Sequence, residues 1–302
     1  MGKKQITRKE FLALTGAAGM AAASGRISNA FGNFTLSRPL GKTGIMVSPL
    51  CFGAPRTNEI SLIKYALSKG VNFIDTGRAY GNGNNEKLVG QAVSGIRDKV
   101  VIQSKIRLER NELPSGGKGR KGAEEIRRAL SSKFEASLKA LNSSYIDVLL
   151  IHDAIEEELI FHPETLSFFS DLKKSGSIKA CGFSTHNDYM NLPARNNSEQ
   201  VFDVIMLPFN PKGSFVHSVT GNFSEWNQEK LIGILSESGK KGIGVVAMKT
   251  CSGGKYSLTP GREPDFVQSV EWVLQHDFIS SAAVAMANFE QVDQHIRLLN
   301  QS

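Results

Sequence analysis

From residue 49 onward, short apolar runs alternate with longer segments in which apolar residues recur at helical spacing. The runs are mostly apolar rather than alternating, which is typical of strands that are buried on both faces. Eight runs are predicted as strands: residues 50–53, 72–75, 100–105, 146–152, 180–184, 203–207, 244–249 and 281–286.

The segments between the runs carry the signals of amphipathic helices. The clearest lies between the third and fourth runs, and its apolar stripe comprises Ile126, Leu130, Phe134, Leu138 and Leu141. The last helical segment opens with Asn288 and Gln291, a cap residue followed three places on by a residue that can complete a capping box.

Eight strands that are each followed by a helix, in about 260 residues, predict an α/β fold of the (β/α)8 TIM-barrel class. A doubly wound open sheet is the alternative, and it requires a G-x-G-x-x-G fingerprint after its first strand. The segment CFGAPRTNE does not supply one. Three long segments without a helical or strand pattern, residues 107–122, 210–227 and 251–264, all follow strands. In a barrel they surround one mouth, where active sites are built.

Composition narrows the class of protein. The chain has 302 residues, of which 40% are hydrophobic and 22% charged, and no apolar run reaches 18 residues. We therefore expect a globular protein without an integral membrane segment. The formal net charge is +7, but residues 1–30 hold five basic residues and one acidic residue, so +4 of it lies there. No single element collects the remaining charge, which argues against nucleic-acid binding.

The three cysteines, Cys51, Cys181 and Cys251, are far apart and show no CxxC spacing. An odd number excludes a fully paired disulfide framework, and the spacing argues against a metal site built on cysteine. We predict no metal, and we expect Cys51 and Cys181 to have packing roles because they fall in strand-like runs.

Residues 1–30 have the pattern of an export signal. A basic start is followed by a mildly apolar middle rich in Ala and Gly, and the segment ends in SNA, a small-residue cleavage pattern. TRKEFLAL resembles the twin-arginine motif, with Lys9 in place of the second arginine. We expect export to the periplasm, with the barrel formed by residues 31–302. An uncleaved amphipathic helix on a cytoplasmic protein is the alternative.

Polar residues end several of the apolar runs. Asp75 ends the second, Lys105 the third and His152 the fourth, while Tyr80 follows the second within FIDTGRAYGNGNNEKLVG. Neighbouring barrel strands bring such residues within reach of one another. An ammonium beside a phenol favours the ionised form, and a buried ammonium itself requires a carboxylate. Together these four residues suit a general-acid site for carbonyl reduction.

At this point residues 34–300 resemble the aldo-keto reductase family. FTLSRPLGKTGIMVSPLCFG resembles the N-terminal hairpin and first strand of that family, and FIDTGRAYG…NEKLVG its signature. VIQSK and DVLLIHD carry its lysine and histidine. The resemblance implies a (β/α)8 barrel with an N-terminal β-hairpin. It also implies a bound NADP(H) or NAD(H) and hydride transfer to an aldehyde or ketone. By this resemblance we expect Tyr80 to be the proton donor, Asp75 and Lys105 to tune it, and His152 to orient the substrate.

The resemblance also assigns residues to the nicotinamide end of the nucleotide: Gly53, Ser184, Thr185, Met206 and Met248. Ser184 in GFSTHN matches the family residue that binds the carboxamide. Thr185 stands where the family usually has asparagine, Met206 where it has glutamine, and Met248 where it has a stacking aromatic residue. A thioether can still pack on a ring face.

At the adenosine end the resemblance points to Asn288, Gln291, Gln294 and His295. The lysine and arginine of members that prefer NADP correspond to Ala285 and Gln291 here, so a 2′-phosphate gains no charge-assisted hydrogen bond from them. Asn288 and Gln291 are equally interpretable as a capping box. The preference between NAD and NADP is left open.

Two other functional classes are compatible with these patterns. One is a nucleotide-binding sensory or accessory barrel with slow turnover, which the altered nicotinamide contacts leave room for. The other is a protein that works with a separate redox partner. The four strand-end residues favour the enzyme, acting on a small carbonyl compound.

Overall fold

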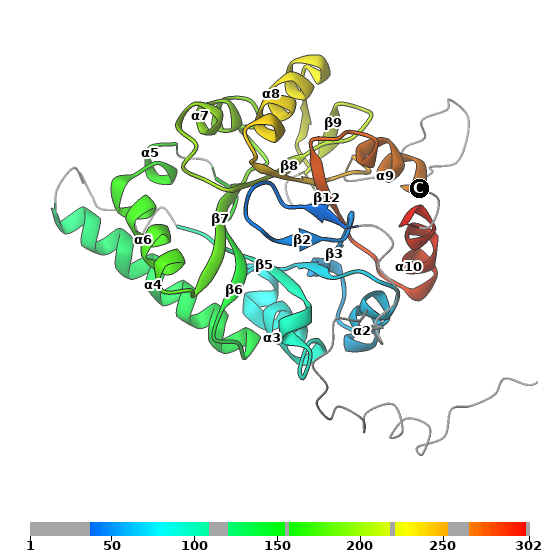
Figure 1. The fold of residues 1–302 in the computed structure, drawn as a ribbon, viewed down its shortest axis with the longest axis horizontal. Helices are drawn as coiled ribbons and strands as arrows, with labels where there is room; N and C mark the ends of the chain where they lie inside the picture. The colour runs from blue at the N-terminus through cyan, green and yellow to red at the C-terminus, as the bar shows by residue number, and fades with distance from the viewer. Residues whose placement is uncertain (1–36, 109–119, 155–156, 218–220, 253–265, 300–302) are drawn as a thin grey trace, which may run out of the picture. The chain divides into compact units, whose positions relative to one another are not determined.

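The computed structural model describes residues 37–108, 120–154, 157–217, 221–252 and 266–299, drawn in colour in Figure 1. The chain divides into two units, residues 1–30 and residues 31–302. The predicted export signal, residues 1–30, lies outside the described residues, so the account below concerns the second unit.

Eight parallel strands close into a barrel, as the sequence predicts (Figure 1). They lie side by side in chain order, and the last strand pairs with the first. Their bounds are β3 (Leu50–Gly53), β4 (Phe73–Asp75), β5 (Val101–Ile106), β6 (Ile146–Ile151), β7 (Ile178–Ser184), β8 (Val204–Pro208), β11 (Gly244–Met248) and β12 (Ile279–Val284).

Each barrel strand is followed by at least one helix, and the helices surround the barrel (Figure 1). They are α2 (Ile60–Ser68), α3 (Asn84–Ala92), α4 (Arg120–Leu141), α5 (Glu157–Ile160), α6 (Pro163–Lys174), α7 (Asn191–Glu199), α8 (Gln228–Lys240), α9 (Phe266–Leu274) and α10 (Phe289–Ile296). Among the described residues no helix is both long enough and apolar enough to cross a membrane.

Residues 210–227 differ from the expectation of an irregular loop. They contain an antiparallel pair, β9 (Ser214–Val216) and β10 (Phe223–Glu225), which the sequence did not reveal because each strand has only three residues. Phe215 anchors this hairpin with 1% of its surface exposed. Most of the other two long loops lies outside the described residues.

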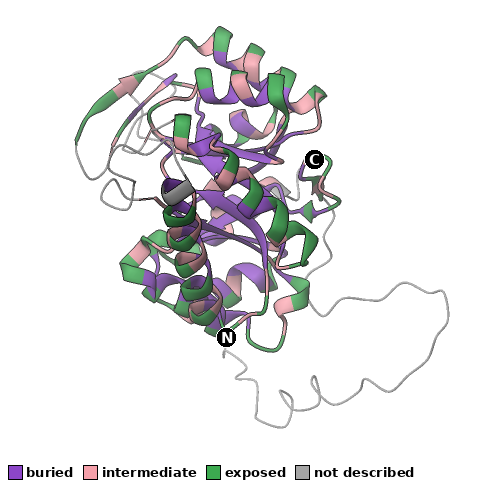
Figure 2. Ribbon diagram, turned by 90° about the vertical axis from the view of Figure 1, so that its left-hand side faces the viewer, coloured by how far each residue is buried: buried purple, intermediate pink, exposed green. Residues whose placement is uncertain are grey.

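The apolar runs are explained by two separate cores, seen as the purple interior in Figure 2. One lies inside the barrel, and Cys51, Phe73, Val148 and Val246 are among its members. The other fills the space between the strands and the helices. A barrel strand contributes alternate residues to each core, so both of its faces are apolar.

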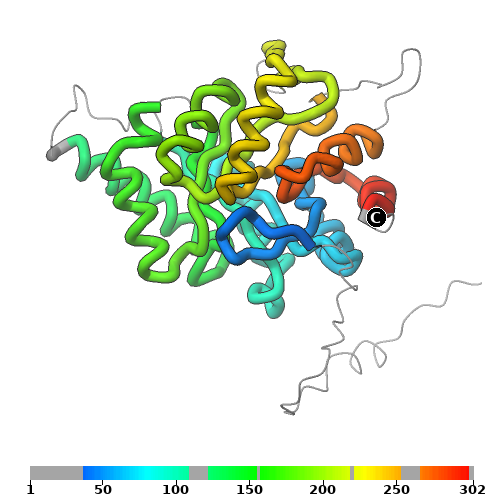
Figure 3. The backbone as a smooth tube through the Cα atoms, turned by 45° about the horizontal axis from the view of Figure 1, so that its top comes forward, coloured from blue at the N-terminus to red at the C-terminus, as the bar shows by residue number. Residues whose placement is uncertain are grey.

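The N-terminal hairpin lies across the end of the barrel at which the strands begin (dark blue in Figure 3). Its strands are β1 (Arg38–Pro39) and β2 (Met46–Val47). Leu40, Ile45 and Val47 belong to the core inside the barrel. The Lys42 amide donates to the Gly242 carbonyl at 2.7 Å. Gly41 has φ +57°, and a Cβ there would overlap the same carbonyl, so the turn requires glycine.

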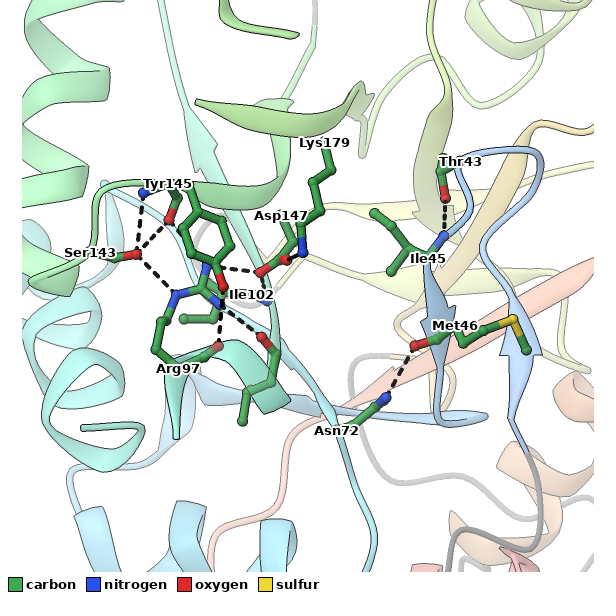
Figure 4. Close-up of polar contacts among 11 residues, drawn as sticks. Thr43, Ile45, Met46, Asn72, Arg97, Ile102, Ser143, Tyr145, Asp147 and Lys179 are labelled. Carbon is green, nitrogen blue, oxygen red and sulfur yellow. Dashed lines mark hydrogen bonds and ion pairs between the residues drawn. The ribbon is translucent and has the colours of Figure 1, made fainter. Parts of the chain in front are cut away.

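A buried carboxylate joins three strands near this closed end (Figure 4). Asp147 on β6 is 1% exposed. It accepts hydrogen bonds from Arg97 Nη2 at 2.8 Å, Lys179 Nζ at 2.7 Å and the Ile102 amide at 2.9 Å. The Arg97 guanidinium also lies 4.0 Å from the centre of the Tyr145 ring. This network ties β5, β6 and β7 to the turn before β5.

Replacing Asp147 with Asn should therefore destabilise the barrel without touching its open mouth. The expected loss is about 3 kcal/mol of unfolding free energy, because the Arg97 cation loses its counter-charge in a mostly buried site. Urea unfolding measures this loss. Lys179→Gln is the matched control, with an expected loss below about 1 kcal/mol, because its side chain is 51% exposed. Equal losses in the two variants would show that Asp147 is not the centre of the network.

Candidate active site

The open end of the barrel gathers the four residues singled out from the sequence, three at strand ends and one in a loop. Asp75 is the last residue of β4, Lys105 lies near the end of β5, and His152 follows β6 directly. Tyr80 begins the 3₁₀ turn Tyr80–Gly83 after β4. Because β4, β5 and β6 are adjacent and parallel, their side chains converge at one mouth.

The loop that carries Tyr80 is held from both sides. Its backbone continues the strand ladder, since the Arg78 amide donates to the Lys105 carbonyl at 2.9 Å. The Arg78 side chain donates to the Asn82 carbonyl at 2.9 Å and pairs with the buried Glu86 carboxylate at 3.0 Å. Gly77 leaves space for the Tyr80 ring, which a Cβ there would approach to 3.3 Å.

Lys105 is the centre of the site and is 1% exposed. Its Nζ atom donates to Asp75 Oδ2 at 2.7 Å, to the Thr76 carbonyl at 2.8 Å and to Tyr80 Oη at 3.2 Å. A protonated lysine has three N–H donors, so these three acceptors satisfy it completely. Burial acts to lower the pKa of Lys105, but Asp75 and Tyr80 together raise it above its ordinary value. The side chain is therefore an ammonium at neutral pH.

The Tyr80 hydroxyl accepts a hydrogen bond from Lys105, which leaves its own proton free for another acceptor. Burial raises the pKa of Tyr80, the Lys105 charge acts to lower it, and Asp75 raises it further. The ammonium thus acts in the direction expected from the sequence, but burial outweighs it. Tyr80 is a neutral phenol at physiological pH, the form that a proton donor requires.

His152 faces Tyr80 edge to face, with ring centres 5.3 Å apart. Burial and the nearby Lys105 charge lower the pKa of His152 to about 3, so its ring is neutral at physiological pH. Its Nδ1 atom is buried and has no hydrogen-bond partner in the described part of the chain. A neutral imidazole carries one N–H and can donate a hydrogen bond, but it is no proton source at this pKa.

The structure also brings Asp153 to the mouth, which the sequence analysis did not single out. It adopts a left-handed backbone conformation with φ +52°, uncommon for a residue other than glycine. Its carboxylate lies 3.5 Å from His186 Nδ1 and 3.7 Å from Arg107 Nη1. His186 and Arg107 hold the pKa of Asp153 below its ordinary value, although burial opposes them. Its position directly after His152 was the available signal.

The sequence analysis also missed two cations at this end, Lys249 and Arg56. Lys249 follows β11 in a left-handed conformation, φ +52°, and burial together with the charge of Arg56 lowers its pKa. Neither side chain has an ion-pair partner among the described residues. A lysine directly after a barrel strand is the same signal that identified Lys105, but the sequence analysis examined only Met248 beside it.

The hydroxyls of Ser184 and Thr185, predicted to lie near the nicotinamide, are buried and take part in local hydrogen bonds. Ser184 Oγ accepts from the Asp153 amide at 3.3 Å. Thr185 Oγ1 donates to the Ala154 carbonyl at 3.1 Å and accepts from the amides of residues 187 and 188. These bonds fix the loops after β6 and β7, and a nucleotide contact for either residue stays a prediction.

The other three residues predicted at the nicotinamide end line the barrel interior. Met206 and Met248 belong to its core, with 2% and 8% of their surface exposed. Gly53 allows a close approach of β12, since a Cβ there would lie 3.0 Å from the Val284 carbonyl. Their assignment to the nucleotide also stays a prediction.

At the adenosine end Asn288 caps the last helix as predicted, but Gln291 completes the cap through the backbone amide of Ala287 rather than through that of Asn288. Asn288 Oδ1 accepts from the Gln291 amide at 2.9 Å, and Gln291 Oε1 accepts from the Ala287 amide at 2.7 Å. Gln294 contacts Glu290 at 3.4 Å on the same helix. His295 is 4% exposed, and its Nδ1 lies 2.8 Å from the Gln291 carbonyl oxygen. The side-chain oxygens of Asn288 and Gln291 are thus both used at the start of the helix.

The depressed pKa of His152 predicts an acid-dependent loss of stability. Protonation costs the folded state more than the unfolded state, so stability is complete above pH 6.5 and falls as the pH drops towards 3. Between pH 7 and 4.5 this one group should remove roughly 2.5 kcal/mol of unfolding free energy. Urea unfolding at both pH values, on the parent and on His152→Gln, isolates the effect. Equal acid sensitivity in the two proteins would contradict it.

Comparisons with known proteins show which proteins this chain resembles. The chain is 33% identical over 136 residues to an aldo-keto reductase, YhdN, of Bacillus subtilis. It is 31% identical over 137 residues to a methylglyoxal reductase, YeaE, of Escherichia coli. These alignments cover 44% and 45% of this chain, but only 38% and 42% of the two relatives.

Solved structures share the fold across most of the chain. The holo form of aldo-keto reductase AKR11C1 from Bacillus halodurans matches with a TM-score of 0.67 at 21% identity, covering 88% of this chain and 91% of that one. An aldo/keto reductase from Klebsiella pneumoniae, solved with NADP and acetate, matches with a TM-score of 0.63 at 20% identity, covering 87% and 89%. Residues 53–292 match the Aldo/keto reductase family, and the chain therefore belongs to that family.

Proposed function

We propose that this protein reduces an aldehyde or ketone with NADH or NADPH, and that Tyr80 is the proton donor. The observation that carries this proposal is the set of three hydrogen bonds from the buried Lys105 ammonium to Asp75, the Thr76 carbonyl and Tyr80. A lysine so placed polarises a phenol whose proton points elsewhere. The matched family and the reductases among its relatives support the same reaction class.

The four residues divide the work as follows. Tyr80 gives its proton to the substrate carbonyl oxygen, and Lys105 stabilises the negative charge that then develops on the phenol oxygen. Asp75 keeps Lys105 charged and fixes its direction. His152, neutral and beside the Tyr80 ring, donates a hydrogen bond that orients the same carbonyl oxygen. This complete set favours an enzyme over a sensory or accessory barrel.

A nicotinamide nucleotide supplies the hydride when it is bound, and the described residues suit its charge. Lys249 and Arg56 are two cations at the open end without a carboxylate partner among the described residues, and a dinucleotide brings a pyrophosphate. Met248 offers a thioether at the adjoining position of the barrel. Asn288 and Gln291 use their side-chain oxygens at the start of α10, and neither residue is a cation that could bind a 2′-phosphate, so the preference between NAD and NADP is open.

Tyr80→Phe is the direct test of the function. It removes the proton donor but leaves the ring, so carbonyl reduction should fall on the order of 10²–10⁴-fold. Nucleotide affinity should stay nearly unchanged. The assay follows nicotinamide absorbance over a panel of small aldehydes and ketones, with nucleotide binding titrated separately.

Tyr65→Phe provides the control, because its hydroxyl bonds Asp293 between α2 and α10 rather than Lys105. We expect it to keep full activity. Undiminished reduction by Tyr80→Phe would remove Tyr80 from the mechanism.

We further propose that residues 1–30 direct export of the folded protein to the periplasm. The support is the charge pattern of the segment, TRKEFLAL and the SNA end. Fractionation of cells that express the full chain should find it outside the cytoplasm and shortened by the signal. A variant carrying Arg8→Gln and Lys9→Gln should stay full-length in the cytoplasm. If the parent chain is also full-length and cytoplasmic, the protein is cytoplasmic and this proposal fails.

Export has a consequence for the cofactor. Outside the cytoplasm a released nucleotide is not recycled, so an exported reductase has to release its nucleotide slowly or receive electrons from a redox partner. A folded-cargo route allows the nucleotide to bind before transport.

A further inference from the structure

Gln103 lies inside the barrel on the same face of β5 as Lys105, two residues earlier. It is completely buried. Its surroundings in this layer are otherwise mostly apolar, since the core inside the barrel contains Cys51, Val148, Leu150 and Met206. A buried amide costs free energy unless it is hydrogen bonded. Its partners therefore show what it does.

Gln103 makes two hydrogen bonds through its side-chain amide nitrogen. Nε2 donates to Asp75 Oδ1 at 2.7 Å and to Met206 Sδ at 3.3 Å. The opposite orientation of the amide would place its oxygen against the Asp75 carboxylate, so the charge of Asp75 sets the direction of the group. Oε1 has no hydrogen-bond partner among the described residues. The side-chain amide of Gln103 is thus oriented with its N–H donors towards Asp75 and Met206.

Met206 completes this arrangement from the far side of the barrel. It belongs to β8, which is separated from β5 by β6 and β7. Its sulfur therefore crosses the interior to reach the second N–H of Gln103. The glutamine is fixed between a carboxylate on one strand and a thioether on another.

The contact with Asp75 continues into the catalytic residues. Asp75 Oδ1 lies 2.6 Å from Lys105 Nζ and also accepts from Gln103, so the ammonium shares this oxygen with a neutral donor. Hydrogen bonds to a carboxylate spread its charge over its donors. When Gln103 donates to Asp75, the carboxylate neutralises the positive charge of Lys105 less completely. Lys105 then acts more strongly on the Tyr80 hydroxyl.

We infer that Gln103 is a positioning residue of this site: it fixes the Asp75 carboxylate from inside the barrel and thereby strengthens the action of Lys105 on the Tyr80 hydroxyl. Among the described residues, the charged groups that act most strongly on this hydroxyl are Lys105 on β5, Asp75 on β4 and Asp153 after β6. Lys105 is the only cation among them. A change in how far Asp75 neutralises the Lys105 charge therefore alters the electrostatic environment of the Tyr80 hydroxyl.

Gln103→Met tests the inference in the full-length protein. Methionine has a similar length and volume but no N–H donor. Labelling tyrosine with ¹³C at Cζ gives a resonance for Tyr80, assigned by its loss in Tyr80→Phe. In Gln103→Met this resonance should move part of the way towards its position in Lys105→Met. Turnover of a carbonyl substrate should fall about threefold to tenfold, the order of the net contribution of one ordinary hydrogen bond, because Gln103 acts on Tyr80 only through Asp75 and Lys105; nucleotide affinity should be unchanged.

Met206→Leu is the matched control. It removes the sulfur contact of Gln103 but leaves the bond between Gln103 and Asp75, so the Tyr80 resonance should move much less than in Gln103→Met. If Gln103→Met slows turnover or lowers the melting temperature without moving the Tyr80 resonance, Gln103 is merely structural and the inference is wrong.

A measurement on the parent protein covers the case in which Gln103→Met does not fold. The Gln103 side-chain N–H that faces Asp75 should resonate downfield of ordinary glutamine amides and exchange slowly with solvent. Ordinary shifts and fast exchange would overturn the inference. The inference rests on the proposed function, because it concerns the action of Lys105 on the proton donor Tyr80. The NMR resonances, however, are measured without a substrate. Failure of carbonyl reduction and failure of the Gln103 coupling are therefore separate results.

Discussion

The architecture of the open end depends on one buried ammonium. Lys105 is 1% exposed, and an isolated charge at that depth would lose its proton. Asp75 prevents this, and with Asp75 and the Thr76 carbonyl occupied, the third N–H of Lys105 is directed at Tyr80. The ends of β4 and β5 and the loop that carries Tyr80 therefore have to stay in register for the charge to be tolerated.

Much of the fold could be predicted from the sequence because two separate cores leave a strong trace. A barrel strand that contributes to both becomes an apolar run, and all eight such runs are strands. The stripe from Ile126 to Leu141 and the Asn288 cap of the last helix are confirmed for similarly local reasons. The β9–β10 hairpin was missed because three-residue strands have too little periodicity to stand out from a loop.

The site was only partly predictable, and the limit is physical. Strand ends are visible in the sequence, so Asp75, Lys105 and His152 could be found. The balance of forces on Tyr80 could not, because burial raises its pKa by more than Lys105 lowers it, and burial depends on the packed loop. Gln103 was missed for a related reason: its importance comes from contacts with Asp75 on a neighbouring strand and with Met206 across the barrel.

The two ends of the barrel show what turns a buried ion pair into a chemical site. Near the closed end, Asp147 is the acceptor for Arg97 and Lys179, and the side chain of Lys179 is 51% exposed to solvent. The Asp147 carboxylate therefore has a structural role, in linking neighbouring strands. At the open end the central group is a cation, Lys105, which donates to three acceptors. Its last donor points to a phenol at the mouth, so the same kind of pair there controls a proton instead of a fold.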